Sequence, residues 1–304
     1  MLACVLPKKS NDGINLMNAM NAINEFRADA TDTGFVRQGL RSALLYGIVI
    51  YLTVYQCKLV HADLISVTNA SFEDVSGSTV FNEFTFGPPV GWQIYDPHGL
   101  VINNGAGPDF WIGTLRPTPP TFFNSVPDGE RVAIPFNVSG TGNLGEYGLQ
   151  QTLTATLMPH FQYVLQVEIG NIASGFAESG QFFNLDGFPG YRIDLLAGSI
   201  VIASDNNSLA GSIPEGEWAT STVYFEVPAD HPLLGQNLGI RLVSLNQVDP
   251  AFPGADLEVD FDHVRLIGMA IPEPSTSVFL GLSALILACR RKRGIARPLD
   301  AAYT

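Results

Sequence analysis

The segment LEVDFDHVRLIG, residues 257–268, alternates apolar and polar side chains from Leu257 to Asp262 and again from Val264 to Leu266. Successive side chains of an extended strand point to opposite faces of its sheet, so a period of two gives the strand one apolar face. The segment therefore predicts a β-strand with one side against a core.

Similar patterns occur in the rest of the central region, where Gly, Pro, Asn and Asp clusters separate them and no helical stripe of useful length occurs. The predicted strands are YVLQVEIGN (163–171), YRIDLLAG (191–198), SIVIAS (199–204), TSTVYFEV (220–227) and LGIRLVSL (238–245). The natural way to bury one face of each strand is an all-β, antiparallel two-sheet sandwich. We expect long loops at 76–90, 103–130 and 171–190.

The predicted β-domain, residues 63–270, is strongly acidic. It contains 23 Asp and Glu residues, five Arg and no Lys, which leaves a formal net charge of −18. Such a surface repels phosphate backbones, so nucleic acid is excluded as a partner, whereas divalent cations are favoured. The three cysteines, Cys4, Cys57 and Cys289, all lie outside this region, which rules out a disulfide framework and a Cys-ligated zinc there.

A short apolar run lies before this domain. Arg37 and Arg41 precede ALLYGIVIYLTV (43–54), and YQCKLVHA (55–62) then ends with small residues at Val60 and Ala62, which is the order of a secretory signal. Twelve helical residues reach only about 18 Å, less than the roughly 30 Å of a bilayer core. We predict a signal peptide at 37–62 that is cleaved after Ala62, with an uncleaved signal anchor as the alternative. Residues 1–36 are predicted to be a non-structural extension.

A second apolar run lies near the other end, in IPEPSTSVFLGLSALILACRRKR, residues 271–293. The proline-acid-proline trio predicts a stiff, accessible strand, because proline fixes its own φ and extends the residue before it. Residues 277–289 predict a short transmembrane helix, and the basic block after it stays on the cytoplasmic side. The residues that form the trio and the block are Pro272, Glu273, Pro274, Arg290, Arg291, Lys292 and Arg293.

This order of motifs resembles the PEP-CTERM sorting signal of Gram-negative bacteria. The resemblance implies recognition by an exosortase, a membrane protease or transpeptidase, followed by release or attachment of the domain at the cell surface, in the envelope or in an exopolysaccharide matrix. The tail at 294–304 departs from the usual pattern, in which the signal ends nearer the basic block. A plain C-terminal membrane anchor is the alternative.

The domain itself resembles galactose-binding-like jelly rolls, the fold of many carbohydrate-binding modules. Its opening, ISVTNASFED (65–74), and its closing, VDFDHVRLIG (259–268), carry this resemblance. The resemblance implies that Glu73 and Asp262 ligate a structural calcium ion, and no other cofactor is expected. Alternatively, these side chains are exposed strand carboxylates.

Aromatic residues in or beside loops suggest where a sugar could stack. Tyr95, Phe110 and Trp111 are the candidate ligand-binding residues, because aromatic faces next to Asp and Asn suit a pyranose ring. Trp92 and Trp218 stand at strand starts and are expected in the core.

No catalytic arrangement stands out in the sequence. The domain histidines are scattered, and there is no G-x-S-x-G, phosphate-binding loop or paired cysteine. We therefore expect a non-enzymatic, exported cell-surface protein whose domain is a carbohydrate-binding or matrix module, with polysaccharide as its partner. The alternatives are a ligand-free structural or adhesion protein and a secreted hydrolase.

Overall fold

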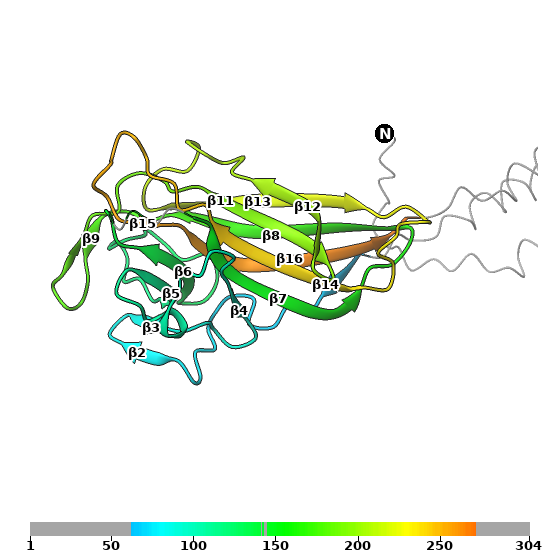
Figure 1. The fold of residues 1–304 in the computed structure, drawn as a ribbon, viewed down its shortest axis with the longest axis horizontal. Coiled ribbons are helices and arrows are strands. Elements are labelled where there is room, and N and C mark those ends of the chain that lie inside the picture. The colour runs from blue at the N-terminus through cyan, green and yellow to red at the C-terminus, as the bar shows by residue number, and fades with distance from the viewer. Residues whose placement is uncertain (1–61, 141, 143–144, 272–304) are drawn as a thin grey trace, which may run out of the picture. The chain divides into compact units, whose positions relative to one another are not determined.

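The computed structural model describes residues 62–140, 142 and 145–271, and these fold into antiparallel β-sheets (Figure 1). In this part of the chain the only helical element is the 3-10 turn η1 (Asn103–Gly105), and no helix is long and apolar enough to cross a membrane. The residues of the predicted sorting signal, most of the predicted signal peptide, the predicted helix at 277–289 and the tail at 294–304 lie outside the described residues. Ala62, where we predicted cleavage, begins the first strand.

Two large sheets form the fold, together with one small hairpin. In order across the larger sheet the strands are β13 (Glu217–Glu226), β8 (Phe161–Asn171), β16 (Asp260–Ala270), β6 (Val132–Asn137), β5 (Phe110–Leu115), β3 (Phe84–Phe86) and β2 (Thr79–Phe81), with β1 (Ala62–Ile65) paired to β16 and β15 (Leu257–Glu258) paired to β6. The smaller sheet is β12 (Ile200–Asn206), β11 (Tyr191–Ala197), β14 (Asn237–Ser244), β7 (Tyr147–Thr156) and β4 (Gln93–Tyr95). The hairpin is β9 (Gly175–Phe176) and β10 (Phe182–Phe183).

The all-β, antiparallel prediction is confirmed. The segments predicted as strands coincide with β8, β11, β12, β13, β14 and β15–β16 to within a few residues at their ends. The first and last strands are neighbours, because Ala62 pairs with Met269 and Ile65 with Leu266.

The three predicted long loops are only partly loops. Strands β2 and β3 lie within 76–90, β5 lies within 103–130, and β9 and β10 lie within 171–190. Four of these five strands are two or three residues long, which is too short to show a period of two, and β5 is interrupted by Gly113. Their backbone pairing makes them strands: β2 pairs with β3, β3 with β5, β5 with β6, and β9 with β10.

The main core lies between the two large sheets. Alternate residues of β16 and β11, such as Phe261, Leu266, Ile193 and Leu195, point into it and are almost completely buried. Trp92 joins this core, as expected, with its ring 5.3 Å from that of Phe72. Burial of these faces is the main stabilising contribution, at about 25 cal/mol per Å² of apolar surface.

The opposite face of the larger sheet is also covered, and its side chains form a second apolar cluster that we name the outer core. In β6, Ala133 points into the main core, whereas Val132, Ile134 and Phe136 point into the outer core. The segment 116–131 and the segment 172–187, which contains β9 and β10, complete it. Its buried members are Phe84, Leu115, Phe122, Phe123, Val132, Ile134, Phe136, Ile172, Ala177, Phe183 and Leu185.

Candidate functional site

Aromatic rings from several elements meet in the outer core. Trp111 of β5 stacks on Phe136 of β6 with 4.5 Å between ring centroids, and the Phe86 ring of β3 meets the Trp111 ring edge-on at 5.5 Å. Phe183 of β10 lies 5.7 Å from Phe136 and 5.9 Å from Phe84. The Trp111 indole Nε1–H donates to the Gly107 carbonyl oxygen at 2.7 Å, which fixes the orientation of that ring. We call Phe84, Phe86, Trp111, Phe136 and Phe183 the aromatic cluster.

A surface pocket of about 270 Å³ opens over the aromatic cluster. It is lined by Phe81 and by four residues of the aromatic cluster: Phe84, Phe86, Trp111 and Phe183. Ser179 and Gln181, from the turn of the β9–β10 hairpin, add the polar groups. A concave, mostly aromatic surface with a few polar groups at one edge is typical of a site for a small, flat, apolar molecule.

A buried carboxylic acid lies under this pocket. Glu258 of β15 shares with Phe84, Trp111 and Phe183 a closed space that leaves no room for a water molecule. The Glu258 side chain is 4 % exposed, and its Oε1 atom has no hydrogen-bond partner. Burial raises the pKa of Glu258 and the charge of Asp256 adds to the rise, so the uncharged acid is the favoured form.

A second acid, Asp260, lies two residues further along the strand. Its side chain is completely buried, and its carboxyl group shares a hydrogen bond with that of Glu258. Burial raises the pKa of Asp260, and the nearby Glu258 charge raises it further. Two carboxyl groups without a cation cannot both ionise in such a place, so the pair holds at least one proton.

A different acidic group gathers at the segment 128–131. Asp262, which is completely buried, accepts the Asp128 N–H at Oδ2 over 2.9 Å. Glu73 Oε1 accepts the N–H groups of Glu130 and Arg131, both at 2.7 Å. The structure therefore brings Glu73 and Asp262, the two predicted calcium ligands, to one short segment.

The acidic group at 128–131 has no metal-ligand geometry as it stands. Burial raises the pKa of Asp262 to about 8, and the charges of Asp128 and Glu73 add to the rise. Among the residues that the structure describes, no three His, Cys, Asp or Glu side chains are arranged as metal ligands.

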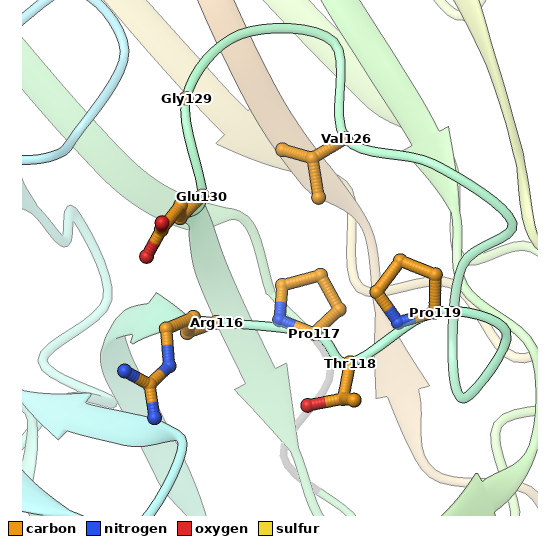
Figure 2. Close-up of a pocket in the computed structure, with 7 residues that line it drawn as sticks. All are labelled: Arg116, Pro117, Thr118, Pro119, Val126, Gly129 and Glu130. Atoms are coloured by element: carbon orange, nitrogen blue, oxygen red, sulfur yellow. The ribbon is translucent and has the colours of Figure 1, made fainter.

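A second surface pocket, of about 390 Å³, lies beside the same segment (Figure 2). In Figure 2, Val126 and Pro117 face each other across it, and Arg116 and Glu130 lie together at one end. No carboxylate lies within ion-pair distance of the Arg116 guanidinium in the described part of the chain. The pocket is lined by charges of both signs and by no aromatic ring, so it suits cation chemistry less well than the pocket over the aromatic cluster.

The three predicted ligand-binding aromatics do not come together. Trp111 lies in the aromatic cluster, but Phe110, the next residue along β5, points into the main core, 3 % exposed, with its ring 5.3 Å from that of Tyr147. Tyr95 belongs to the other large sheet, where its ring lies 4.0 Å under the Arg241 guanidinium and its hydroxyl donates to Glu146 at 2.7 Å. Only Trp111 of the three lines the pocket over the aromatic cluster.

Sequence reasoning missed Glu258, Phe136 and Phe183. One signal was present: LEVDFD puts three acidic residues on one face of a strand in a region with only five basic residues. What covers that face cannot be read from the period of two, because the covering residues come from distant segments without a pattern of their own.

Residues 63–267 match the model of the HpiC1-like family, described as HpiC1 cyclase. Among solved structures, the Stig cyclase Fisc from Fischerella sp. TAU in complex with (3Z)-3-(1-methyl-2-pyrrolidinylidene)-3H-indole is 39 % identical, over 68 % of this chain and 98 % of that one, with a TM-score of 0.57. A cyclase from the same source in complex with 4-(1H-indol-3-yl)butan-2-one is 38 % identical, over 68 % and 97 % of the two chains, with the same TM-score. No curated protein matches the chain.

These matches correct the predicted identity. The identification as a PEP-CTERM protein with a carbohydrate-binding module is wrong, because the family model that matches is one of cyclases. The prediction of a non-enzymatic binding or matrix module is wrong for the same reason. A sandwich with acidic first and last strands is shared by binding modules and enzymes, so the strand motifs could not separate them.

The predicted partners and location are corrected as well. The similar structures hold indole-containing small molecules, whereas we had predicted an exosortase and a polysaccharide. The predicted export and delivery to the envelope, surface or matrix depended on the PEP-CTERM identification and is wrong with it.

Proposed function

The chain belongs to the HpiC1-like cyclase family, and from this premise we propose that it is an enzyme that closes a ring in an indole-containing small molecule by proton-initiated chemistry. The observation that carries the proposal is the position of Glu258, buried in a dry space directly under an aromatic pocket. Two similar cyclases hold indole compounds, which supports a substrate of that class here.

Glu258 is the proposed general acid. A neutral carboxyl group can donate its proton to an alkene or an electron-rich ring carbon of the substrate, which leaves a carbocation and a Glu258 carboxylate. Burial keeps the acid uncharged near neutral pH, so that it is ready to donate. The hydrogen bond with Asp260 lowers the pKa of Glu258 against the effect of burial, so it stabilises the carboxylate that remains once the proton has moved.

The aromatic cluster stabilises the cation. The faces of Trp111, Phe136 and Phe183 carry partial negative charge, and each desolvated cation–π contact contributes about 0.5–2 kcal/mol. Phe84, Trp111 and Phe183 line both the pocket and the space that Glu258 lines, so the two adjoin at these rings. Ring closure then forms a carbon–carbon bond at the cation, and loss of a proton to the Glu258 carboxylate restores the acid.

This scheme is an isomerisation that needs no oxidant or reductant. If it holds, turnover of an indole with an alkene side chain in D₂O will give a cyclic product that contains deuterium at the protonated carbon. Mass spectrometry of the product measures this directly. A cyclic product free of solvent deuterium would contradict proton initiation, and no cyclic product from any alkenyl-indole would contradict the proposed activity.

We propose in addition that calcium binds at the acidic group at 128–131. The convergence of Asp262, Asp128 and Glu73 supports this, because no described cation forms an ion pair with any of them. A calcium ion prefers six to eight oxygen ligands, which these three carboxylates and nearby backbone carbonyls can supply. The ion would hold the segment 128–131 against β16, beside the outer core.

Calcium is therefore expected to stabilise the fold. At a concentration 100-fold above its Kd it raises the free energy of unfolding by about 2.7 kcal/mol, which thermal unfolding with and without EDTA measures. Asp262→Asn abolishes the calcium-dependent rise, whereas Asp230→Asn, at an exposed loop residue, retains it. An unchanged melting temperature in the wild-type protein would exclude the ion.

We also propose that the two large sheets form a jelly roll. Support comes from the chain path, which moves repeatedly between the sheets: β3 and β4, β6 and β7, β7 and β8, and β14 and β15 are successive strands in different sheets.

A further inference from the structure

The β9–β10 hairpin forms a flap over the outer core. Its two strands pair only with each other, so no hydrogen-bond ladder joins the hairpin to either large sheet. Phe183 and Ala177 point inward and are buried, whereas Phe176 and Phe182 are exposed on the outer side. In Figure 1 the hairpin, labelled at β9, lies at the end of the fold where β5, β6 and β15 are found. Its placement decides whether Phe183 covers Glu258.

The base of the flap is held by its own residues and by the segment before β15, from which the Asp256 N–H donates to the Asn184 carbonyl oxygen at 2.7 Å. Ser174 Oγ donates to Asp186 Oδ1 at 2.6 Å and accepts the Leu185 N–H at 2.8 Å. These bonds close the loop at the two residues that flank the hairpin. They do not tie the tip of the flap to the sheet below.

The tip of the flap is held by a buried carboxylate from another part of the chain. The turn 177–180 is closed by the Gly180 N–H, which donates to the Ala177 carbonyl oxygen at 2.8 Å. The N–H of Glu178, in the middle of that turn, donates to Glu83 Oε1 at 2.7 Å. A hydrogen bond from a backbone amide to a carboxylate is stronger than one to a neutral acceptor.

Glu83 is itself firmly placed. It lies between β2 and β3, its side chain is only 3 % exposed, and its carbonyl oxygen accepts the Arg116 N–H at 2.8 Å. Its other carboxylate oxygen, Oε2, is buried without a hydrogen-bond partner. Burying a carboxylate is costly unless it makes strong hydrogen bonds, so a residue that only filled this space would be apolar.

We propose that Glu83 is a positioning residue that latches the flap, keeps Phe183 over Glu258 and so excludes water from the reacting cation. The inference rests on the proposed cyclase function. An open flap would admit water next to a carbocation, and water would then compete with ring closure. Glu83 contacts the flap and not the reacting atoms, and therefore acts through Phe183.

One substitution removes the hydrogen bond between Glu178 and Glu83 from its donor side. Glu178→Pro removes the N–H that Glu83 accepts, and proline is favoured at the second residue of such a turn, so the hairpin itself is kept. Glu83→Ala removes the acceptor, and Glu83→Gln restores an oxygen acceptor in the same place. Glu178→Ala is the matched control, because it changes the same residue but leaves its backbone N–H.

Two measurements test the latch. Hydrogen exchange of the amides of residues 175–183, without ligand, is expected to accelerate about 10- to 100-fold in Glu178→Pro and in Glu83→Ala. The dissociation rate of 4-(1H-indol-3-yl)butan-2-one is expected to rise by a similar factor. The two changes remove the same bond, so the double variant is expected to match either single one, whereas Glu178→Ala and Glu83→Gln stay close to wild type.

Wild-type exchange and dissociation rates in Glu178→Pro would overturn the proposal. Equal effects of Glu178→Ala and Glu178→Pro would also overturn it, because the N–H would then be irrelevant. If the wild-type protein does not bind the indole probe, the substrate class proposed above fails, but the exchange measurement without ligand still decides whether Glu83 latches the flap.

Discussion

Glu258→Gln is expected to lower kcat/KM for ring closure by about 10²- to 10⁴-fold, the usual contribution of a general acid. Glutamine has nearly the shape of the neutral acid that burial favours at this position, so the folded structure is retained. The substrate still binds, since the pocket walls are unchanged. Steady-state kinetics and calorimetric binding of 4-(1H-indol-3-yl)butan-2-one separate the two effects.

The raised pKa of Glu258 also predicts that the stability of the wild-type protein changes with pH. Because the pKa of Glu258 is raised in the folded protein, the unfolded state loses its proton first as the pH rises. Glu258 therefore lowers the free energy of unfolding progressively from its ordinary pKa up to its raised one. The charge of Asp256 acts in the same direction as burial, whereas the hydrogen bond with Asp260 lowers the pKa of Glu258 and acts against it.

Wild-type activity is accordingly expected to fall as the pH rises past the raised pKa, and Glu258→Gln is expected to keep more of its stability at high pH. Glu226→Gln, at an exposed position of β13, controls for the loss of a carboxylate elsewhere. Undiminished turnover in Glu258→Gln would remove this residue from the reaction and point to Asp260 as the acid.

Trp111→Ala is expected to weaken binding of 4-(1H-indol-3-yl)butan-2-one at least about 10-fold, since an aromatic contact of this kind is worth about 1 kcal/mol beyond its buried area. It also lowers the free energy of unfolding by about 3 kcal/mol, because the rings of Phe86, Phe136 and Phe183 lose the side chain between them. Calorimetry and chemical denaturation measure the two losses.

Matched variants separate binding from folding here. Trp111→Phe keeps a ring on Phe136 and is expected to recover most of the stability and part of the affinity. Tyr95→Ala removes an aromatic residue from the other large sheet, where it packs under Arg241, and is expected to leave indole affinity unchanged. Weakened binding in Tyr95→Ala with wild-type affinity in Trp111→Ala would place the ligand on the wrong sheet for the proposed function.

The site was predictable from sequence only in part. Trp111 was singled out because a loop aromatic suits ligand binding, and it lies in the pocket over the aromatic cluster. Phe110 and Trp111 are adjacent, and neighbours on a strand point to opposite faces of the sheet. Which of the two faces carries the ligand pocket depends on the segments that pack against the sheet. Glu73 and Asp262, which were predicted to act together, both accept hydrogen bonds from the segment 128–131.

The sequence by itself determined the strands of the β-domain and their antiparallel pairing, since a period of two leaves one face of each strand apolar and that face must be buried against a second sheet. It also showed that the domain has few basic side chains to pair with its acids, five Arg against 23 Asp and Glu. Only the tertiary structure decided that the polar face of this segment is buried too. The segment 116–131 and the β9–β10 hairpin cover it, and they carry no period that reveals where they pack. That cover turns Glu258 from a solvated strand carboxylate into a neutral acid beneath aromatic rings, because burial removes the water that would otherwise stabilise its charge.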